Sequence, residues 1–150
     1  MATALQYTPV TREEVRTDLG RFLTLFTELE DRDGVMPMFS AAIDAEWHRL
    51  LDDPDAYGRF CDRHTGGARI GHRPLTGQGT VEWVPAYQER YGTLPPAWFA
   101  DAAGTVDAAA YGAYLRTGTV VTGWDCSPIE GGDDTDTDDD GAAPRPSVRR

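Results

Sequence analysis

Apolar residues recur at helical spacing in the first part of the chain. Between Thr11 and Leu29 they return every three or four residues, which is the period of one face of an α-helix. Thr11 followed by Glu14 is the pattern of a capping box, in which each side chain binds the backbone amide of the other residue. The pattern predicts a helix that begins after Thr11 and ends before the turn sequence DRDG at residues 31–34.

Two more helices are predicted between residues 40 and 65. Ser40 is a favourable N-cap, and the apolar residues that follow it, among them Trp47, form an inward stripe. Asp53 followed by Pro54 is a typical start for the next helix, because proline at the first helical position loses no hydrogen bond. A pair of glycines then ends that helix. We expect a helical hairpin here.

The second half of the chain predicts two further helices, at residues 80–91 and 105–117. Residues 68–79 contain several glycines and a proline, so we expect a loop that passes through a short extended piece at Ile70. Residues 93–104 are expected to be a rigid connection. Residues 119–128 are rich in β-branched side chains and predict a short extended segment.

These elements predict an all-α fold, a small bundle of about five helices in one domain spanning residues 1–128. The remaining residues, 129–150, include the run EGGDDTDTDDDG, which holds seven acids and no aliphatic or aromatic side chain. Such a run buries too little apolar area to offset the entropy lost on ordering. We therefore expect a disordered acidic tail.

The charge of the chain argues against several functions. The net charge is −11, and all the positive charge comes from arginine because lysine is absent. An acidic surface repels phosphate backbones, so we expect no nucleic-acid partner. No signal peptide or long apolar run is visible, which predicts a cytoplasmic protein without a membrane partner. In that compartment both cysteines should be reduced thiols.

The residues able to carry chemistry gather in one window. Asp44 and His48 stand four residues apart, so they share one face of a helix. Cys61 and His64 stand three apart on the next helix, and His72 follows on the predicted loop. Imidazole, thiolate and carboxylate together suit zinc or iron. The window predicts a metal site.

Two other interpretations of this window remain. Buried cysteine is common, and a histidine beside a core tryptophan is often bonded to a carboxylate, so a packed helical core explains the same residues. A Cys–His nucleophile is the third interpretation, although Cys61 lies well inside its helix, away from the N-terminus that lowers a thiol pKa.

The segments at residues 35–61 and 86–99, with the Gly-His pair ending at His72, resemble the N-terminal domain of the glycine-rich domain-containing protein-like family. The resemblance covers about residues 21–99. It implies that Asp44, His48, Cys61 and His72 belong to the family pattern, which favours the metal site, and it implies no reaction. His64 lies outside the pattern, and Leu50 replaces the second histidine of the W-H-x-H form found in many members.

Two hypotheses of different classes follow. The first is a small cytoplasmic helical protein that binds one zinc or iron ion through His48, Cys61 and His72, with Asp44 as a fourth ligand or as an orienting partner. The second is a metal-free helical module that docks a protein partner through exposed aromatic residues. The sequence leaves open an enzymatic role, the oligomeric state and the roles of His64 and Cys126.

Overall fold

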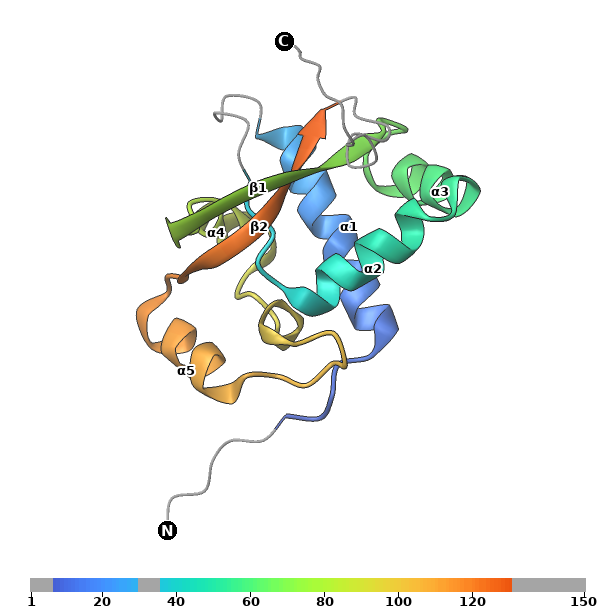
Figure 1. Cartoon of the computed structure of the whole chain (residues 1–150). Helices are drawn as coiled ribbons and strands as arrows, with labels where there is room; N and C mark the ends of the chain where they lie inside the picture. Colours follow the sequence, from blue (N-terminus) through green and yellow to red (C-terminus); the bar gives the residue numbers. More distant parts are fainter. Residues whose placement is uncertain (1–6, 30–35, 131–150) are drawn as a thin grey trace.

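The computed structural model describes residues 7–29 and 36–130 of the chain. Figure 1 shows how its helices and strands are arranged. The elements in chain order are α1 (Arg12–Glu28), α2 (Ala41–Leu51), α3 (Pro54–His64), β1 (Ile70–Thr80), α4 (Val84–Tyr91), the 3₁₀ helix η1 (Pro96–Phe99), α5 (Ala108–Thr117) and β2 (Val121–Glu130).

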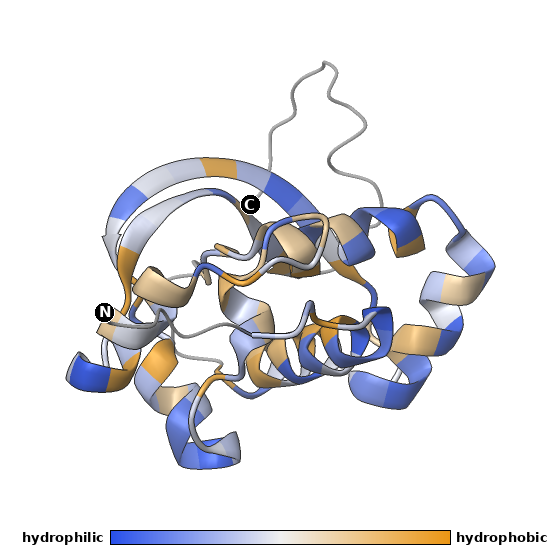
Figure 2. Cartoon of the chain, turned by 90° about the horizontal axis from the view of Figure 1, so that it is seen from below, coloured by the Kyte–Doolittle hydropathy of each residue, from blue (hydrophilic) through white to orange (hydrophobic). Residues whose placement is uncertain are grey.

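Helix α1 supplies the centre of the core. It packs against α2, α3, α4 and η1, and its buried side chains include Leu19, Phe22 and Phe26. Its start is as predicted: the amide of Glu14 donates to Thr11 Oγ1 at 3.0 Å, and the amide of Thr11 donates to Glu14 Oε1 at 2.8 Å. Figure 2 shows hydrophobic and hydrophilic residues alternating along the helices, as expected for helices that cover a shared core.

Aromatic rings from distant parts of the sequence fill the core beside α1. The ring centroids of Phe22 and Trp83 lie 5.2 Å apart, and those of Trp83 and Trp98 lie 4.9 Å apart, both edge to face. Trp98 is fully buried on η1. Edge-to-face pairs add stabilisation beyond the area that they bury. The connection at residues 93–104 therefore places Trp98 in the core.

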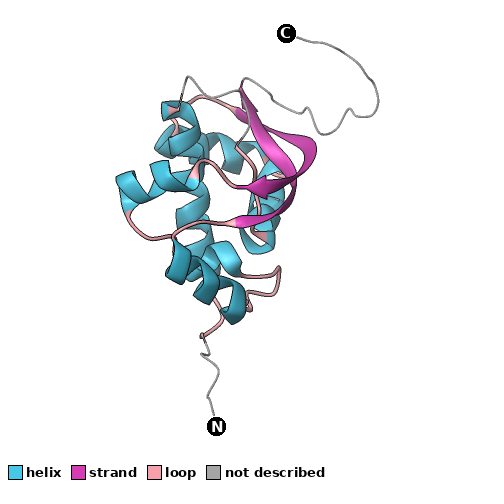
Figure 3. Cartoon of the chain, turned by 90° about the vertical axis from the view of Figure 1, so that its left-hand side faces the viewer, coloured by secondary structure: helices cyan, strands magenta, loops and turns pink. Residues whose placement is uncertain are grey.

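The all-α prediction is wrong, because the described chain also contains an antiparallel sheet of two long strands. β1 pairs with β2 from Ile70 opposite Glu130 to Thr80 opposite Val121, with an irregularity between Pro74 and Gly77. Figure 3 shows this ribbon lying along one side of the helices. The fold is therefore mixed α and β, with five α-helices and one two-stranded sheet among the described residues.

Composition explains why β1 was predicted to be a loop. The strand contains three glycines and a proline, which are poor strand formers. After its first three buried residues, the side chains alternate between half-buried and exposed, so no apolar run marks it. Its hydrogen bonds come from β2, far along the chain, and a local pattern cannot show such a partner.

The helix predicted at residues 80–91 is shorter in the structure, and the extended segment predicted after residue 118 is a strand. Residues 80–91 form a helix only from Val84 onward, because Pro85 occupies the first turn and the helix cannot begin much earlier. The extended segment after residue 118 is confirmed as β2, which continues past the predicted domain end at residue 128 to Glu130. Of the predicted tail, residues 131–150 lie outside the described residues.

Among the described helices, none combines the length and the apolar character that crossing a membrane requires.

Candidate metal centre

Asp44 joins three side chains from three different elements. Its Oδ1 accepts a hydrogen bond from His72 Nε2 at 3.1 Å and another from Cys126 Sγ at 3.3 Å. Its Oδ2 lies 3.4 Å from His48 Nε2. Asp44 and His48 belong to α2, His72 to β1 and Cys126 to β2. The centre therefore forms only where the ribbon meets α2.

The register of the ribbon brings His72 and Cys126 to the same face. His72 is opposite Pro128, and Cys126 is opposite Pro74, so the two residues are diagonal neighbours across the strands. Diagonal neighbours in an antiparallel pair project from one face of the sheet. The amide of Met38 donates to the carbonyl of Cys126 at 3.0 Å, which fixes the backbone of β2 at this point.

Helix α2 holds its two polar residues beside a buried tryptophan. Asp44 and His48 are one helical turn apart, as predicted, and Trp47 between them is fully buried. The Trp47 ring lies edge to face with His72 at 4.7 Å between centroids, and the rings of His48 and His72 are 4.2 Å apart. Trp47 thus limits how far the His72 ring can turn.

The exposed fraction of the side chains increases across the centre, from the ribbon to α2. His72 and Cys126 are buried, with 6% and 5% of their surface exposed, whereas the side chains of Asp44 and His48 are 32% and 47% exposed. The buried thiol and imidazole form the floor, and His48 stands at the side that faces solvent.

The environment changes the pKa of the carboxyl and of the thiol in opposite directions. Burial alone would raise the pKa of Asp44, but the hydrogen bond from His72 and the neighbouring histidine charges outweigh it and lower the pKa. Burial, followed by the negative charge of Asp44, raises the pKa of Cys126. A divalent cation would reverse this effect, because it stabilises a thiolate directly.

Three of these residues form a group that could hold a metal ion. One ligand atom from each of Asp44, His72 and Cys126 lies within 4.8 Å of the other two. The group mixes carboxylate, imidazole and thiol, the three ligand types that zinc accepts in proteins. The structure therefore supports a possible Asp–His–Cys metal site, and it identifies no ion.

Cys61 is placed elsewhere by the structure. It is fully buried on α3, close to Tyr57, whose pKa is raised by burial and by this thiol. The Tyr57 hydroxyl donates to the carbonyl of Ile70 and accepts a bond from Trp47 Nε1 at 3.2 Å. The Cys61 thiol thus belongs to the packing between α2, α3 and the start of β1, and the candidate group contains Cys126 in its place.

His64 also lies outside the centre. Its ring is 4.5 Å from that of Phe60, and a Cβ added to Gly20 would come within 2.6 Å of the imidazole. Burial and the charge of Arg63 lower the pKa of His64. The face of α3 that carries Cys61 and His64 therefore packs inward, instead of meeting the acid–histidine face of α2.

Cys126 was the residue whose role the sequence left open. Neither segment alone indicates that Cys126 belongs to the site. The two segments together do, because the extended segment that contains Cys126 and the glycine-rich segment that contains His72 have similar lengths and can pair. If both had been assigned as strands, an antiparallel pairing could have placed the thiol and the imidazole on one face.

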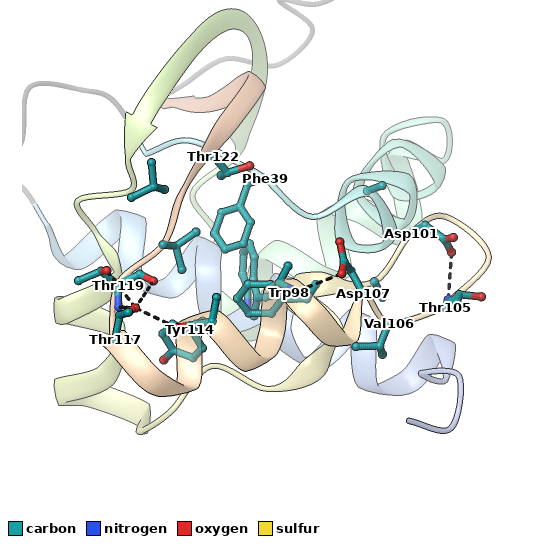
Figure 4. Close-up of a pocket in the computed structure, with 17 residues that line it drawn as sticks. Phe39, Trp98, Asp101, Thr105, Val106, Asp107, Tyr114, Thr117, Thr119 and Thr122 are labelled. Carbon is teal, nitrogen blue, oxygen red and sulfur yellow. Dashed lines mark hydrogen bonds between the residues drawn. The ribbon is translucent and has the colours of Figure 1, made fainter. Parts of the chain in front are cut away.

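A second concave region lies away from this centre, between α5, η1 and the ribbon. The cavity has a volume of about 690 Å³, and Figure 4 shows Phe39, Trp98 and Tyr114 around it, with Thr117 and Thr119 at one end and Thr105 at the other. Among the described residues, the large apolar side chains that are exposed are Leu115 and Val121, both aliphatic. The aromatic rings line a hollow and do not form an exposed face.

Comparison of the chain with protein-family models, with curated proteins and with solved structures finds no match. The resemblance to the glycine-rich domain-containing protein-like family stays a prediction.

Proposed function

We propose that the chain binds one transition-metal ion, zinc or iron, through Asp44, His72 and Cys126, with His48 as the fourth ligand. The observation that carries this proposal is the convergence of His72 Nε2 and Cys126 Sγ on one oxygen of Asp44, at 3.1 and 3.3 Å.

The spacing of these atoms suits a tetrahedral ion. Bonds of about 2.0–2.3 Å to nitrogen, oxygen and sulfur place neighbouring ligand atoms about 3.3–3.8 Å apart. The two contacts to Asp44 Oδ1 are close to the lower end of that range. The ligand atoms of His72 and Cys126 lie within 4.8 Å of each other, so an ion that replaced the shared protons would draw these two side chains around the Asp44 carboxylate.

The ligand types also restrict the metal. A thiolate ligand disfavours magnesium and calcium, which select oxygen, and favours zinc or ferrous iron. An ionised Asp44 and a Cys126 thiolate would together neutralise a divalent ion, while the histidines would contribute nitrogen without charge. The acidic chain, at a net charge of −11, adds a long-range attraction for cations.

His48 is placed to complete the coordination. It lies on the solvent-facing side, 3.4 Å from the Asp44 oxygen that neither His72 nor Cys126 occupies. A rotation of its exposed side chain would bring a nitrogen toward the ion. Four protein ligands with no open position would make the centre a structural site, whose ion stabilises the fold.

The two cysteines provide a matched test. Cys126→Ser removes a proposed ligand, and Cys61→Ser makes the same change at a buried position outside the centre. We expect cobalt(II) added to the metal-free protein to give a near-ultraviolet thiolate-to-metal charge-transfer band. This band should survive Cys61→Ser and disappear in Cys126→Ser. Elemental analysis of untagged wild-type protein should find close to one equivalent of metal.

Two results would contradict the proposal. One is wild-type protein with less than about a tenth of an equivalent of any transition metal and a melting temperature that chelators leave unchanged. The other is a cobalt band that depends on Cys61 instead of Cys126. The second result would keep a metal site but return it to the residues expected from the sequence.

A metal-free interaction module is the alternative function. Its exposed aromatic face is absent among the described residues, so the surface left for it is the cavity beside α5, whose apolar lining and volume of about 690 Å³ could take apolar side chains of a partner. Under this alternative the Asp44 cluster is a hydrogen-bonded brace between α2 and the ribbon. The measurement of metal content decides between the two.

A further inference from the structure

Three arginines surround a buried glutamate on α2. This glutamate does not belong to the candidate metal centre. Glu46 is fully buried. Its Oε1 accepts bonds from Arg12 Nε at 2.9 Å and Arg49 Nε at 3.0 Å, and its Oε2 accepts one from Arg16 Nε at 3.1 Å. Two of these arginines come from α1 and one from α2, so the cluster spans the contact between the two helices.

The cluster carries more positive charge than the glutamate needs. Three guanidinium groups against one carboxylate leave an excess of two positive charges, in a chain whose net charge is −11. A single bidentate arginine would already compensate a buried carboxylate. Glu14, the acid two positions along α1 from Arg12, has one oxygen bound to the Thr11 amide in the capping box. A structural brace between the helices therefore does not account for all three arginines.

The ends of the guanidinium groups remain available. Each arginine binds Glu46 through Nε, and no described residue accepts a hydrogen bond from the Nη atoms of Arg12, Arg16 or Arg49. Their side chains are 61%, 43% and 53% exposed. A guanidinium end presents two parallel N–H groups, the geometry that matches a carboxylate or phosphate edge. The carboxylate of Glu46 fixes the direction in which these forks point.

A small hollow adjoins the cluster. It has a volume of about 180 Å³ and is lined by Arg12, Glu46 and Arg49, by residues 102–104 of the loop after η1, and by the apolar Val10, Val15 and Ala42. Arg16 does not line the hollow and reaches the cluster through Glu46 Oε2. A hollow of this size has room for a few water-sized groups, which suits a compact oxyanion better than a large planar ligand.

We propose that Arg12, Arg16 and Arg49, held by Glu46, form a binding site for a phosphoryl group, either inorganic phosphate or the phosphate of a small ester. The excess of two positive charges matches a dianion. The forks supply several N–H donors to its oxygens, and the buried glutamate keeps the three guanidinium groups together when the site is empty.

Titration of the full chain with inorganic phosphate at constant ionic strength tests the site. We expect saturable one-site binding in calorimetry, together with NMR shifts of the Nε–Hε signals of the three arginines. Arg16→Gln and Arg49→Gln should each weaken binding roughly tenfold or more, because each removes charge-assisted hydrogen bonds. Arg90→Gln removes the same charge from a distant surface pair with Glu28, and should change binding by less than about twofold.

Further variants separate recognition from folding. Arg16→Lys keeps the charge but loses the fork, so we expect weaker phosphate binding in a protein whose melting temperature stays close to that of the wild type. Glycerol 3-phosphate should bind as well as or better than inorganic phosphate if an ester is the natural ligand, and worse if the hollow admits only the free ion. Nitrate, a monoanion, should compete poorly.

Three outcomes would overturn the inference. The first is the absence of saturable shifts at the three arginines. The second is an equal loss of binding in Arg90→Gln, which would reduce the effect to net charge. The third is phosphate binding that Arg16→Gln and Arg49→Gln leave unchanged, which would place the bound ion away from these arginines.

Discussion

Asp18 is a buried acid whose hydrogen bonds tie three elements together. Its Oδ1 accepts bonds from the hydroxyl of Tyr87 on α4 and from Trp98 Nε1 on η1, the latter at 3.2 Å. Burial raises its pKa, although both hydrogen bonds and the charge of Arg21 act in the opposite direction. The ionised form of this acid is therefore less favourable in the folded protein than in the unfolded chain.

This shift predicts a measurable pH effect. Because the folded pKa lies above the unfolded one, the stability contributed by Asp18 is present below the unfolded pKa and is lost as pH rises through the folded pKa. Asp18→Asn keeps an acceptor for Tyr87 and Trp98 and removes the titration. We expect the difference in unfolding free energy, variant minus wild type, to increase from pH 4 to pH 7 in urea denaturation.

A control defines the role of the two hydrogen bonds. Like Asp18→Asn, Asp18→Ala removes the titration, but it also leaves two buried donors without an acceptor, so it should be about 1–3 kcal/mol less stable than Asp18→Asn at every pH. A variant-minus-wild-type difference for Asp18→Asn that stays constant with pH would show that Asp18 does not change its protonation on unfolding in this range.

At the level of elements, the helices were predictable because their signals are local. Ser40 accepts from the amide of Ile43, and Asp53 accepts from that of Ala56, so each predicted cap is observed as the expected hydrogen bond. The ribbon was not predictable in the same way. Its strands are separated by α4, η1 and α5, and what stabilises them is their mutual pairing together with hydrogen bonds to side chains of α2 and α3.

The irregularity in the ribbon is packed around a tryptophan, and this gives a second prediction. A Cβ at Gly77 would lie 2.5 Å from Nε1 of Trp124, so Gly77→Ala must displace the indole ring. We expect a loss of about 1–3 kcal/mol in unfolding free energy, by overpacking. Gly123→Ala, on the paired strand, meets its nearest atom at 3.6 Å and should change stability by less than about 0.5 kcal/mol.

Equal effects of these two substitutions would indicate that loss of glycine, and not the position of Trp124, governs the ribbon. Because β1 and β2 carry His72 and Cys126, Gly77→Ala should also reduce the metal content under the proposed function. The metal content of Gly77→Ala therefore tests whether the shape of the ribbon affects metal binding at the centre.

At the scale of the whole molecule, about half of the centre could be predicted from the sequence. Asp44 and His48 are one turn apart on a single helix, and such a pair follows from helical period alone. His72 was expected at the site but on a loop. To predict Cys126, the register of two strands that are distant in the sequence would have been needed. Cys61 was expected at the site on the assumption that the face of α3 that carries it meets the polar residues of α2.

The acidic segment provides a prediction for the chain as a whole. Residues 133–140 contain no apolar side chain, so their removal exposes no core. A chain that ends at Glu130, and so keeps the last pairing of β2 with Ile70, should melt at the temperature of the full chain within experimental error. Differential scanning calorimetry measures this. A decrease of several degrees would show that these residues pack on the domain.

The place of β2 in the chain has a consequence for the order of synthesis. Helices α1, α2 and α3 leave the ribosome before the other described elements and contain half of the largest fully buried side chains, so they can begin to pack early. Cys126 emerges only after every helix, and β1 has no strand partner until then. If the centre binds an ion, the nascent chain cannot acquire it with all its ligands. Metal loading would then follow the pairing of β1 with β2.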